Sequence, residues 1–303
     1  MRVLITGVSG YVGGALIPRL RAGGHELRGL ARDPARVRER LPLVTGDVVS
    51  GAGLGEALQG VDVAYYLVHS MEPGLDGRFA EHELRGAENF AAAARAEDVR
   101  RVIYLGGLLP AGLSPSAHLA SRLAVEETLL GASPESVSLR ASIAIGAHSR
   151  SFRLLVRLVE RLRVVPLPAW HTYRTQPLDE RDMLEFLARA LDHPAVAGRS
   201  LDIAGPDIVT YGEMIERIAD LMLVRRSALR LGLTATPVAS RLAARIAGEH
   251  WELVGPLMEG LSGDLLPRDD RAARLLGVRL HSFTRAVEHA LRAWETSEPL
   301  AAR

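Results

Sequence analysis

The feature that most constrains this chain is a glycine-spaced turn between a short apolar strand and a helix. Residues 2–6 form the expected strand, and a helical pattern begins at Tyr11. Gly7 and Gly10 lie between the two, and Gly13 follows in the first helical turn. With this spacing one glycine turns the chain, one lets backbone N–H groups approach an anion, and one seats the helix on the strand. The turn therefore predicts a cradle for the pyrophosphate of a dinucleotide, and the alternative is a plain tight turn.

Apolar segments of strand length alternate with helical patterns as far as residue 145. This alternation favours a parallel sheet with helices on both faces. The segment 61–68 is too apolar for a half-exposed strand, which suits a sheet covered on both sides. Besides 2–6, the expected strands are 26–31, 43–48, 61–68, 102–105 and 137–145, and the expected helices after the first are 79–96 and 117–130.

After Gly146 the pattern becomes mainly helical. We expect a strand at 200–204 and a helix that begins after Thr210, whose hydroxyl would cap it. Residues 230–248 mix apolar residues with arginines, and we interpret them as a packed lid, with a membrane-surface helix as the alternative. The expected helices of this half are 152–162, 179–191 and 211–221.

The predicted fold class is α/β. We expect a doubly wound parallel-sheet Rossmann domain over residues 1–148, joined by a returning strand segment near 174–204. A smaller, mainly helical substrate or lid lobe would occupy residues 149–303. In open parallel sheets, ligands bind at the carboxyl ends of the strands, at the point where the strand order reverses.

Composition narrows the possible chemistry. A net charge of +1 gives no bulk attraction to nucleic acid or to an anionic membrane, and we expect neither partner. No leader pattern precedes the first strand, so we expect a cytoplasmic protein. Because cysteine is absent and all 37 basic residues are arginine, thiolate metal sites, cysteine nucleophiles and lysine Schiff bases are excluded. His69, His118 and His171 lack metal-ligand spacing, and we predict no metal.

Several motifs together resemble those of the atypical and extended short-chain dehydrogenase/reductases, including the NmrA-like group. Residues 6–13 resemble the cofactor motif of that superfamily, and 46–48 resemble its adenine-side motif. Narrower similarity, to the bacterial YbjT-like NAD(P)H-binding branch, lies in 66–71, 118–122 and 140–143. The resemblance implies a Rossmann fold, a nicotinamide cofactor and a small-molecule substrate. The re-entry segment 175–178 and the strand and turn at 201–206 also match the superfamily.

The end of the second strand indicates which cofactor is bound. An acidic residue there would bind a ribose 2′-hydroxyl, whereas an arginine accommodates a 2′-phosphate. Arg32 occupies this place, and Pro34 is expected to hold Asp33 away from the ribose. We therefore predict NADP(H), with a solvated surface arginine as the alternative for Arg32. The other predicted cofactor contacts are Gly7, Ser9, Gly10, Tyr11, Val12, Gly13, Asp47, Val48, Leu67, Val68 and His69.

The catalytic positions depart from the pattern that the resemblance implies, which is a serine after the fifth strand and a tyrosine and lysine four residues apart on the next helix. Gly106-Gly107 replace the serine, His118 the tyrosine and Arg122 the lysine. His118 and Arg122 share one helical face, and an imidazole titrates near pH ~6.5. We predict His118 as proton donor and Arg122 as a ligand of the ribose, although the nearby guanidinium would favour neutral His118. The alternative is a structural histidine and a surface arginine.

Two functions remain open at this point. The first is an NADP(H)-dependent reductase of a small organic substrate with a non-standard active site, which the retained substrate lobe favours. The second is a non-catalytic NADP(H)-sensing regulator or scaffold of the NmrA type, which the missing serine, tyrosine and lysine favour. Substrate, reaction direction and oligomeric state do not follow from the sequence. Candidates for the pocket wall in the second lobe are Arg150, Trp170, His171 and Arg174.

Overall fold

The computed structural model describes residues 1–69, 79–110, 112, 116–230, 263–298 and 300. Within these residues seven strands form one parallel sheet, in the order β11-β6-β5-β4-β1-β2-β3. The order reverses between β1 and β4, which is the ligand-binding position of doubly wound sheets. The strands are β1 (Arg2–Thr6), β2 (Glu26–Ala31), β3 (Leu43–Thr45), β4 (Val63–Tyr66), β5 (Arg101–Gly107), β6 (Val137–Ala141) and β11 (Ser200–Ile203).

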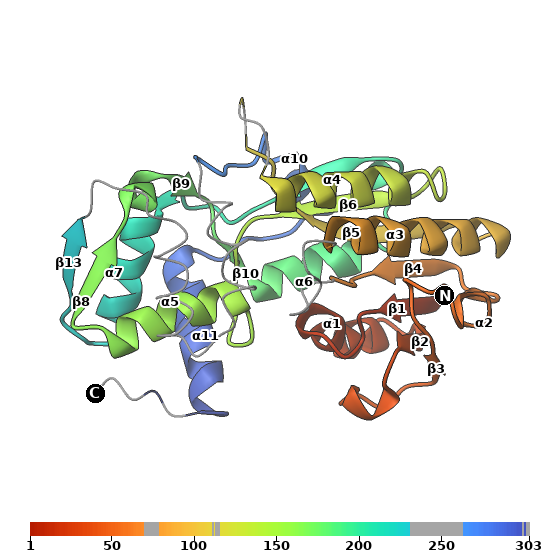
Figure 1. Ribbon diagram of the computed structural model, residues 1–303, viewed down its shortest axis with the longest axis horizontal. Helices are drawn as coiled ribbons and strands as arrows, with labels where there is room; N and C mark the ends of the chain where they lie inside the picture. Colours follow the sequence, from red (N-terminus) through yellow and green to blue (C-terminus); the bar gives the residue numbers. More distant parts are fainter. Residues whose placement is uncertain (70–78, 111, 113–115, 231–262, 299, 301–303) are drawn as a thin grey trace.

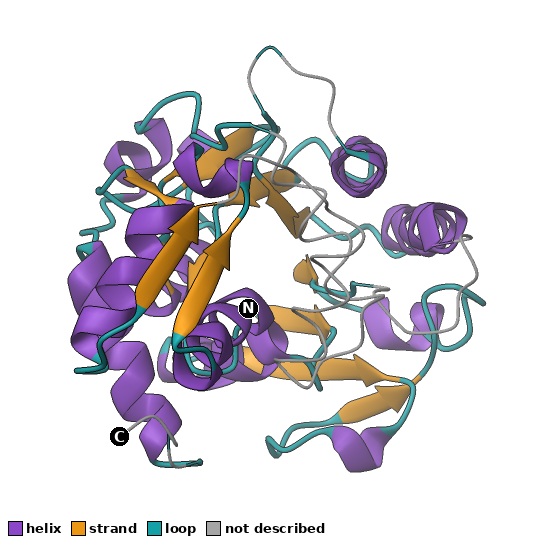
Figure 2. Cartoon of the chain, turned by 60° about the vertical axis from the view of Figure 1, so that its left-hand side comes forward, coloured by secondary structure: helices purple, strands orange, loops and turns teal. Residues whose placement is uncertain are grey.

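Helices cover both faces of this sheet (Figures 1 and 2). Alternate residues of β1 point to opposite faces, so that Val3 and Ile5 join one apolar core and Leu4 joins another. Both cores are buried, and the predicted doubly wound Rossmann fold is confirmed. The first core is closed by α1 (Tyr11–Ala22), α6 (Glu180–Arg189) and α10 (Arg271–Leu276), and the second by α2 (Leu54–Leu58), α3 (Phe79–Ala96) and α4 (Ala117–Leu130).

A second lobe, on the left in Figure 1, has its own core around the fully buried Trp294. Its helix α7 (Tyr211–Leu221) begins as predicted at Thr210, which forms a capping box with Glu213. Among the described residues no helix is long and apolar enough to cross a membrane. The lobe also contains α5 (Arg150–Arg161), α11 (Phe283–Glu295) and the strand pair β8 (Val164–Leu167) and β13 (Ser227–Arg230).

The predicted strand bounds need two corrections. The segment 137–145 is not continuous, because after β6 the Ser142 N–H bonds to Ile203 O, and β7 (Ala144–Ile145) then pairs with β10 (Leu178–Asp179) outside the main sheet. The segment 43–48 ends early as a strand, because the Asp47 carboxylate forms a turn. Arg230 ends β13, and the lid expected beyond it lies outside the described residues. The short strands β9 (Arg174–Thr175) and β12 (Val209–Thr210) pair with each other.

Candidate cofactor and active site

The glycine turn is packed so closely that side chains are excluded from two of its positions. Gly7 has φ +65°, and a Cβ there would lie 2.4 Å from Leu67 O. A Cβ at Gly13 would lie 2.3 Å from Gly7 O. The turn is therefore pressed between α1 and the segment that follows β4, as the spacing of the glycines predicts.

A buried threonine hydroxyl holds the turn against β4. Thr6 Oγ1 donates to Tyr65 O at 3.0 Å and accepts from the Leu67 N–H at 3.2 Å. These two bonds join the carboxyl ends of β1 and β4, the two strands at which the sheet order reverses. As a result Leu67, Val68 and His69 lie beside the glycine turn, where the sequence predicted cofactor contacts.

The N-terminus of α1 is suited to an anion. Gly10 is its N-cap and supplies no side-chain hydrogen bond, and the first turn, which includes Val12, contains no acidic residue. Ser9 and Gly10 are exposed. The backbone N–H groups of the first turn thus have no side-chain acceptor among the described residues, and the helix dipole adds positive potential. The cradle fits the pyrophosphate of a dinucleotide.

Tyr11 uses its side chain for a different purpose. Its hydroxyl donates to Glu180, the first residue of α6, and a Cβ at Gly146 would lie 2.2 Å from the Tyr11 hydroxyl oxygen. Burial, together with the Glu180 carboxylate, raises the pKa of Tyr11, so that the phenol keeps its proton. The side chain therefore joins α1 to α6, and we expect Tyr11 to contact the cofactor through its backbone.

The residues predicted to contact the adenosine end of the cofactor follow β2 and β3, and some of them are exposed while others are buried. Arg32 and Asp33 are exposed, and the Asp33 carboxylate accepts the Ala35 N–H at 3.0 Å in a turn with Pro34. Asp47 accepts the Val49 N–H at 2.7 Å. Val48 is buried, and its carbonyl accepts from Asn89 at 3.0 Å.

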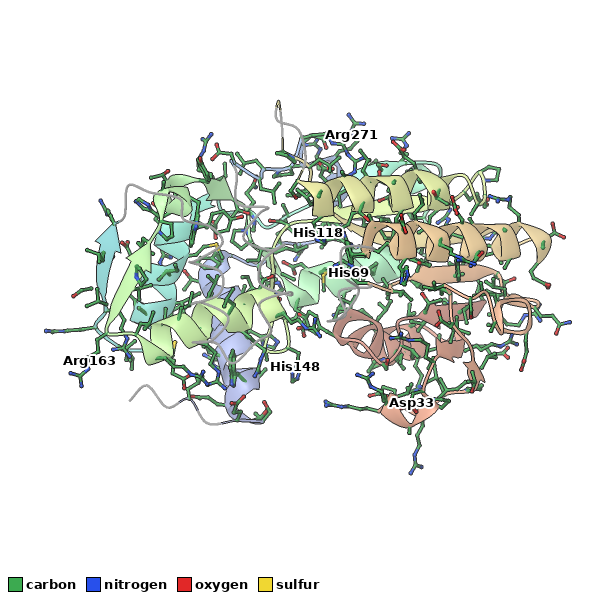
Figure 3. All side chains as sticks on the ribbon, viewed as in Figure 1. Asp33, His69, His118, His148, Arg163 and Arg271 are labelled. Atoms are coloured by element: carbon green, nitrogen blue, oxygen red, sulfur yellow. The ribbon has the colours of Figure 1, made fainter. Side chains whose placement is uncertain are left out.

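Four polar side chains meet at the carboxyl ends of β4 and β5. His69 Nδ1 lies 2.7 Å from the Glu83 carboxylate of α3. Arg122 Nη1 of α4 lies 3.1 Å from both nitrogens of His69, and Arg122 Nη2 donates to Leu105 O. The ring of His118 is 5.3 Å from that of His69, measured between centroids. Figure 3 shows the two histidines in the middle of the molecule. The structure thus brings together His69, His118 and Arg122, and it adds Glu83.

Electrostatics keeps both histidines neutral near pH 7. Burial lowers the pKa of His118 to about 4, and the neighbouring His69 and Arg122 contribute. Loss of solvent and the Arg122 charge also lower the pKa of His69, although its hydrogen bond to Glu83 acts in the opposite direction. Burial would raise the pKa of Glu83, but His69, Arg122 and Ser121 together lower it, so that this carboxylate is ionised.

Glu83 is the functional residue that sequence reasoning missed. It is only 6% exposed, and its second oxygen accepts from the Ser121 hydroxyl at 2.9 Å. The signal was present, because Glu83 lies three, four and seven residues before Gly86, Ala87 and Phe90, which form the buried face of α3. A carboxylate on the apolar face of a helix requires a partner.

Four residues of the second lobe were predicted to line the wall of the substrate pocket, and the structure gives Arg150 different surroundings from the other three. Trp170 is buried in the lobe core against Tyr211, His171 contacts Pro168 O at 2.9 Å, and Arg174 pairs with Asp264 at 2.6 Å. These three have structural partners instead of facing the cluster. Arg150 differs from them, because its charge contributes to the lowered pKa of His69.

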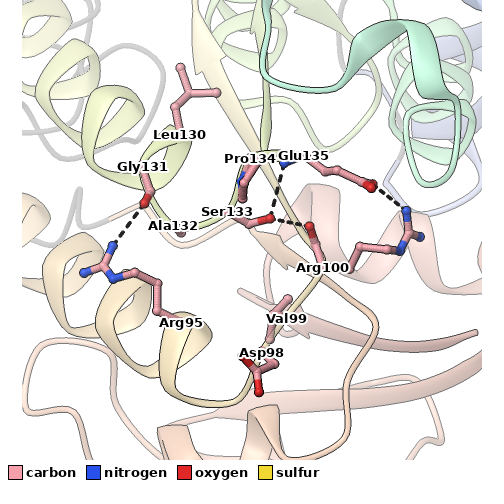
Figure 4. A pocket seen from close by; sticks show the side chains of 10 residues that line it. All are labelled: Arg95, Asp98, Val99, Arg100, Leu130, Gly131, Ala132, Ser133, Pro134 and Glu135. Atoms are coloured by element: carbon pink, nitrogen blue, oxygen red, sulfur yellow. Dashed lines mark hydrogen bonds and ion pairs between the residues drawn. The ribbon is translucent and has the colours of Figure 1, made fainter.

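An open hollow lies at the amino ends of β5 and β6, at the opposite end of the strands from the polar cluster (Figure 4). Arg100 pairs there with Glu135 at 2.6 Å, and Arg95 donates to Gly131 O. Its position at the amino ends of the strands separates it from the cluster. In the described part of the chain, no group of three or more His, Asp or Glu side chains is placed to hold a metal ion.

Comparison with known proteins agrees with this geometry. Residues 7–125 match a family model described as NAD(P)H-binding. The chain is 29% identical over 167 residues to NADH dehydrogenase (ubiquinone) 1 alpha subcomplex subunit 9 of Arabidopsis thaliana, covering 54% of this chain and 40% of that protein. It is also 29% identical over 131 residues to 2-alkyl-3-oxoalkanoate reductase of Shewanella oneidensis, covering 39% and 33%. The chain spans less than half the length of these curated relatives.

A solved structure extends the comparison to nearly the whole chain. The structure is that of a short-chain dehydrogenase/reductase superfamily protein from Agrobacterium tumefaciens with bound NAD, and it covers 98% of both chains at a TM-score of 0.72 and 19% identity. Fold and glycine turn together define an NAD(P)-binding Rossmann protein. Residues 7–125 thus form an NAD(P)H-binding domain, and the fold is shared with a short-chain dehydrogenase/reductase superfamily protein, in agreement with the resemblance carried by residues 6–13.

Proposed function

We propose that this protein transfers a hydride between NADP(H) and a small organic substrate. The observation that carries the proposal is the polar cluster of Glu83, His69, His118 and Arg122, placed beside a glycine cradle at the carboxyl ends of the strands. In doubly wound folds a dinucleotide and its substrate meet at the carboxyl ends of the strands. Dehydrogenases and reductases among the relatives support the same class of reaction.

The preference for NADP(H) rests on Arg32. An exposed guanidinium at the end of β2 suits a 2′-phosphate, and Asp33, the nearest carboxylate, is bonded within its own turn. We expect NADPH to bind at least roughly tenfold more tightly than NADH, which corresponds to ~1.4 kcal/mol. Arg32→Asp should abolish or reverse this ratio in titration calorimetry, whereas Arg36→Asp, the same charge change on an exposed neighbour, should leave it unchanged. Equal affinities of the wild type for both cofactors would refute NADP(H) selectivity.

Arg122 replaces the usual lysine in this proposal. Its guanidinium is held by Leu105 O and lies over the Tyr104 ring at 5.6 Å from the centroid, so that it is fixed beside the cluster. We expect it to bind the cofactor ribose or the substrate oxygen. A screen of carbonyl, enone, quinone and 3-oxo acid substrates, followed by NADPH absorbance, tests for turnover.

The same screen separates the enzyme from the regulator. Gly106-Gly107 offer no hydroxyl at the end of β5, which is the specific observation that favours a non-catalytic NADP(H) sensor. NADPH binding without oxidation by any substrate class, in either direction, would support the sensor and refute hydride transfer.

A further inference from the structure

We propose that His69 is the residue that exchanges a proton with the substrate, and that Glu83 is the positioning residue that fixes its tautomer. This inference rests on the proposed hydride transfer and deepens it. The sequence predicted His118 of α4 as the proton donor, and this inference gives that role to His69, which follows β4. The argument depends on which atoms of the cluster donate and which accept.

The hydrogen bonds around His69 determine its tautomer. Glu83 is ionised and can only accept, so the 2.7 Å contact requires the proton on His69 Nδ1. Nε2 then carries the ring's lone pair. Arg122 Nη1, which can only donate, lies 3.1 Å from both ring nitrogens, and with Nδ1 protonated its hydrogen bond goes to Nε2. Ser121 holds the other Glu83 oxygen at 2.9 Å. The arrangement is a buried carboxylate, an oriented imidazole and an acceptor nitrogen, which are the parts of an oriented general base.

His118 lacks these parts. Its Nδ1 is buried without a hydrogen-bond partner among the described residues, and its nearest aromatic neighbours are His69 and Phe79. A proton added to His118 would create a positive charge next to Arg122 with no carboxylate bonded to it. A proton added to His69 would be stabilised directly by Glu83.

The proposed step conserves atoms and charge. In the oxidation direction the O–H bond of a substrate alcohol breaks and its proton bonds to the lone pair of His69 Nε2, which requires the Arg122 N–H to leave that lone pair first. The hydride leaves the adjacent carbon for the oxidised dinucleotide, and the C–O bond becomes C=O. Glu83 keeps its bond to Nδ1–H throughout and stabilises the imidazolium. Reduction follows the reverse path, in which the imidazolium returns the proton to the substrate oxygen.

Nitrogen NMR of the histidine rings tests the tautomer without any substrate. We expect His69, assigned with His69→Gln, to be protonated on Nδ1 in the wild type. Glu83→Gln keeps the size of the side chain but removes its charge, and should lower the pKa of His69 by about one unit or more. Glu88→Gln, which removes the same charge from the exposed face of α3, should leave it unchanged. An unchanged tautomer and pKa in Glu83→Gln would overturn the role of Glu83.

Kinetics tests the role of His69. With a substrate from the screen, kcat/KM of His69→Gln should fall 10²–10⁴-fold near pH 7, a larger loss than that of His118→Phe. The pH at which kcat/KM of alcohol oxidation declines should shift down in Glu83→Gln. Among the residues that the structure describes, the charged and titratable groups that act on His69 are Glu83, His118, Arg122 and Arg150.

The outcomes distinguish this inference from the function on which it rests. A larger loss in His118→Phe than in His69→Gln would overturn the assignment of His69 and restore His118. If either histidine variant does not fold, the Glu83→Gln shift in the pH profile decides. NADPH binding by all variants with no turnover by the wild type would refute the proposed function itself.

Discussion

Adding a single methyl group at Gly13 should weaken cofactor binding while the protein still folds. The Cβ of Gly13→Ala would lie 2.3 Å from Gly7 O and 2.9 Å from Gly7 C, both of them backbone atoms that no side-chain rotation can move. Helix α1 must therefore shift away from the turn. Overpacking of this kind costs about 1–3 kcal/mol, and the gain in helix propensity from glycine to alanine offsets only about 1 kcal/mol of that. We expect a net loss of stability of up to about 2 kcal/mol.

The adjacent residue is the matched control. A Cβ at Gly14 would meet nothing closer than Val8 O at 3.7 Å, which is an ordinary contact. Gly14→Ala should thus stabilise the protein by about 0.5–1 kcal/mol through helix propensity alone. Urea unfolding measures the stability of both variants, and NADPH fluorescence titration measures cofactor affinity. Gly13→Ala should weaken NADPH at least tenfold, whereas Gly14→Ala should bind it normally.

The pair also defines the result that would refute the reasoning. If Gly13→Ala were as stable as Gly14→Ala and bound NADPH with wild-type affinity, the close approach of α1 to the turn would not position the phosphate cradle. Loss of binding in both variants would show instead that any added methyl group in the first turn of α1 disturbs the site.

Three further predictions concern the site. Gly10→Val places a branched side chain at the mouth of the cradle, where the backbone is extended at φ −85° and a Cβ would lie 3.0 Å from Gly7 O. A small shift of the turn accommodates it, so circular dichroism should be unchanged while NADPH binding is lost; normal binding would refute the cradle. Because the pKa of His118 is lowered to about 4, the folded state binds fewer protons than the unfolded state as pH falls from about 6.5 to about 4, and stability declines over that range. His118→Phe should remove up to about 2 kcal/mol of the decline between pH 7 and pH 5 in urea unfolding, and an identical decline would refute the burial of this ring. Arg122→Ala should raise the pKa of His69 in NMR titration and weaken NADPH; a fall in that pKa would contradict the direction of the Arg122 effect.

Long periodic segments were predicted most accurately. Strand β2 and helices α3 and α4 have the expected bounds of 26–31, 79–96 and 117–130. Their apolar residues repeat at one period throughout, and Ser116 caps α4. The wrong strand bounds lie where a side-chain hydrogen bond, or a bond to a strand distant in sequence, ends the strand. The break after β6 depends on Ile203, more than sixty residues away in sequence, and no local pattern contains it.

The site was predicted only as far as motifs and topology allow. Glycine spacing predicted the cradle, and topology predicted His69 among the cofactor contacts at the carboxyl ends of the strands. The interaction of Thr6 with Tyr65 and Leu67, and that of Tyr11 with Glu180, join residues about 60 and 169 positions apart. Such pairs follow from the register of β1 against β4 and from the docking of α6 on α1, which the sequence pattern does not specify.

Glu83 and Arg122 form one charge-compensated pair with His69 between them. The half-buried guanidinium of Arg122 is fixed between Leu105 O, the Tyr104 ring and His69, and an opposite charge nearby stabilises it there. Glu83 supplies this charge through His69, which contacts both. Steric crowding does not explain a glycine at Gly107, because a Cβ there would meet nothing closer than Leu119 Cδ2 at 3.5 Å among the described residues, an ordinary contact. In this chain the arginine in the lysine position therefore occurs together with an acidic residue on the buried face of α3, and the two charges are linked through His69.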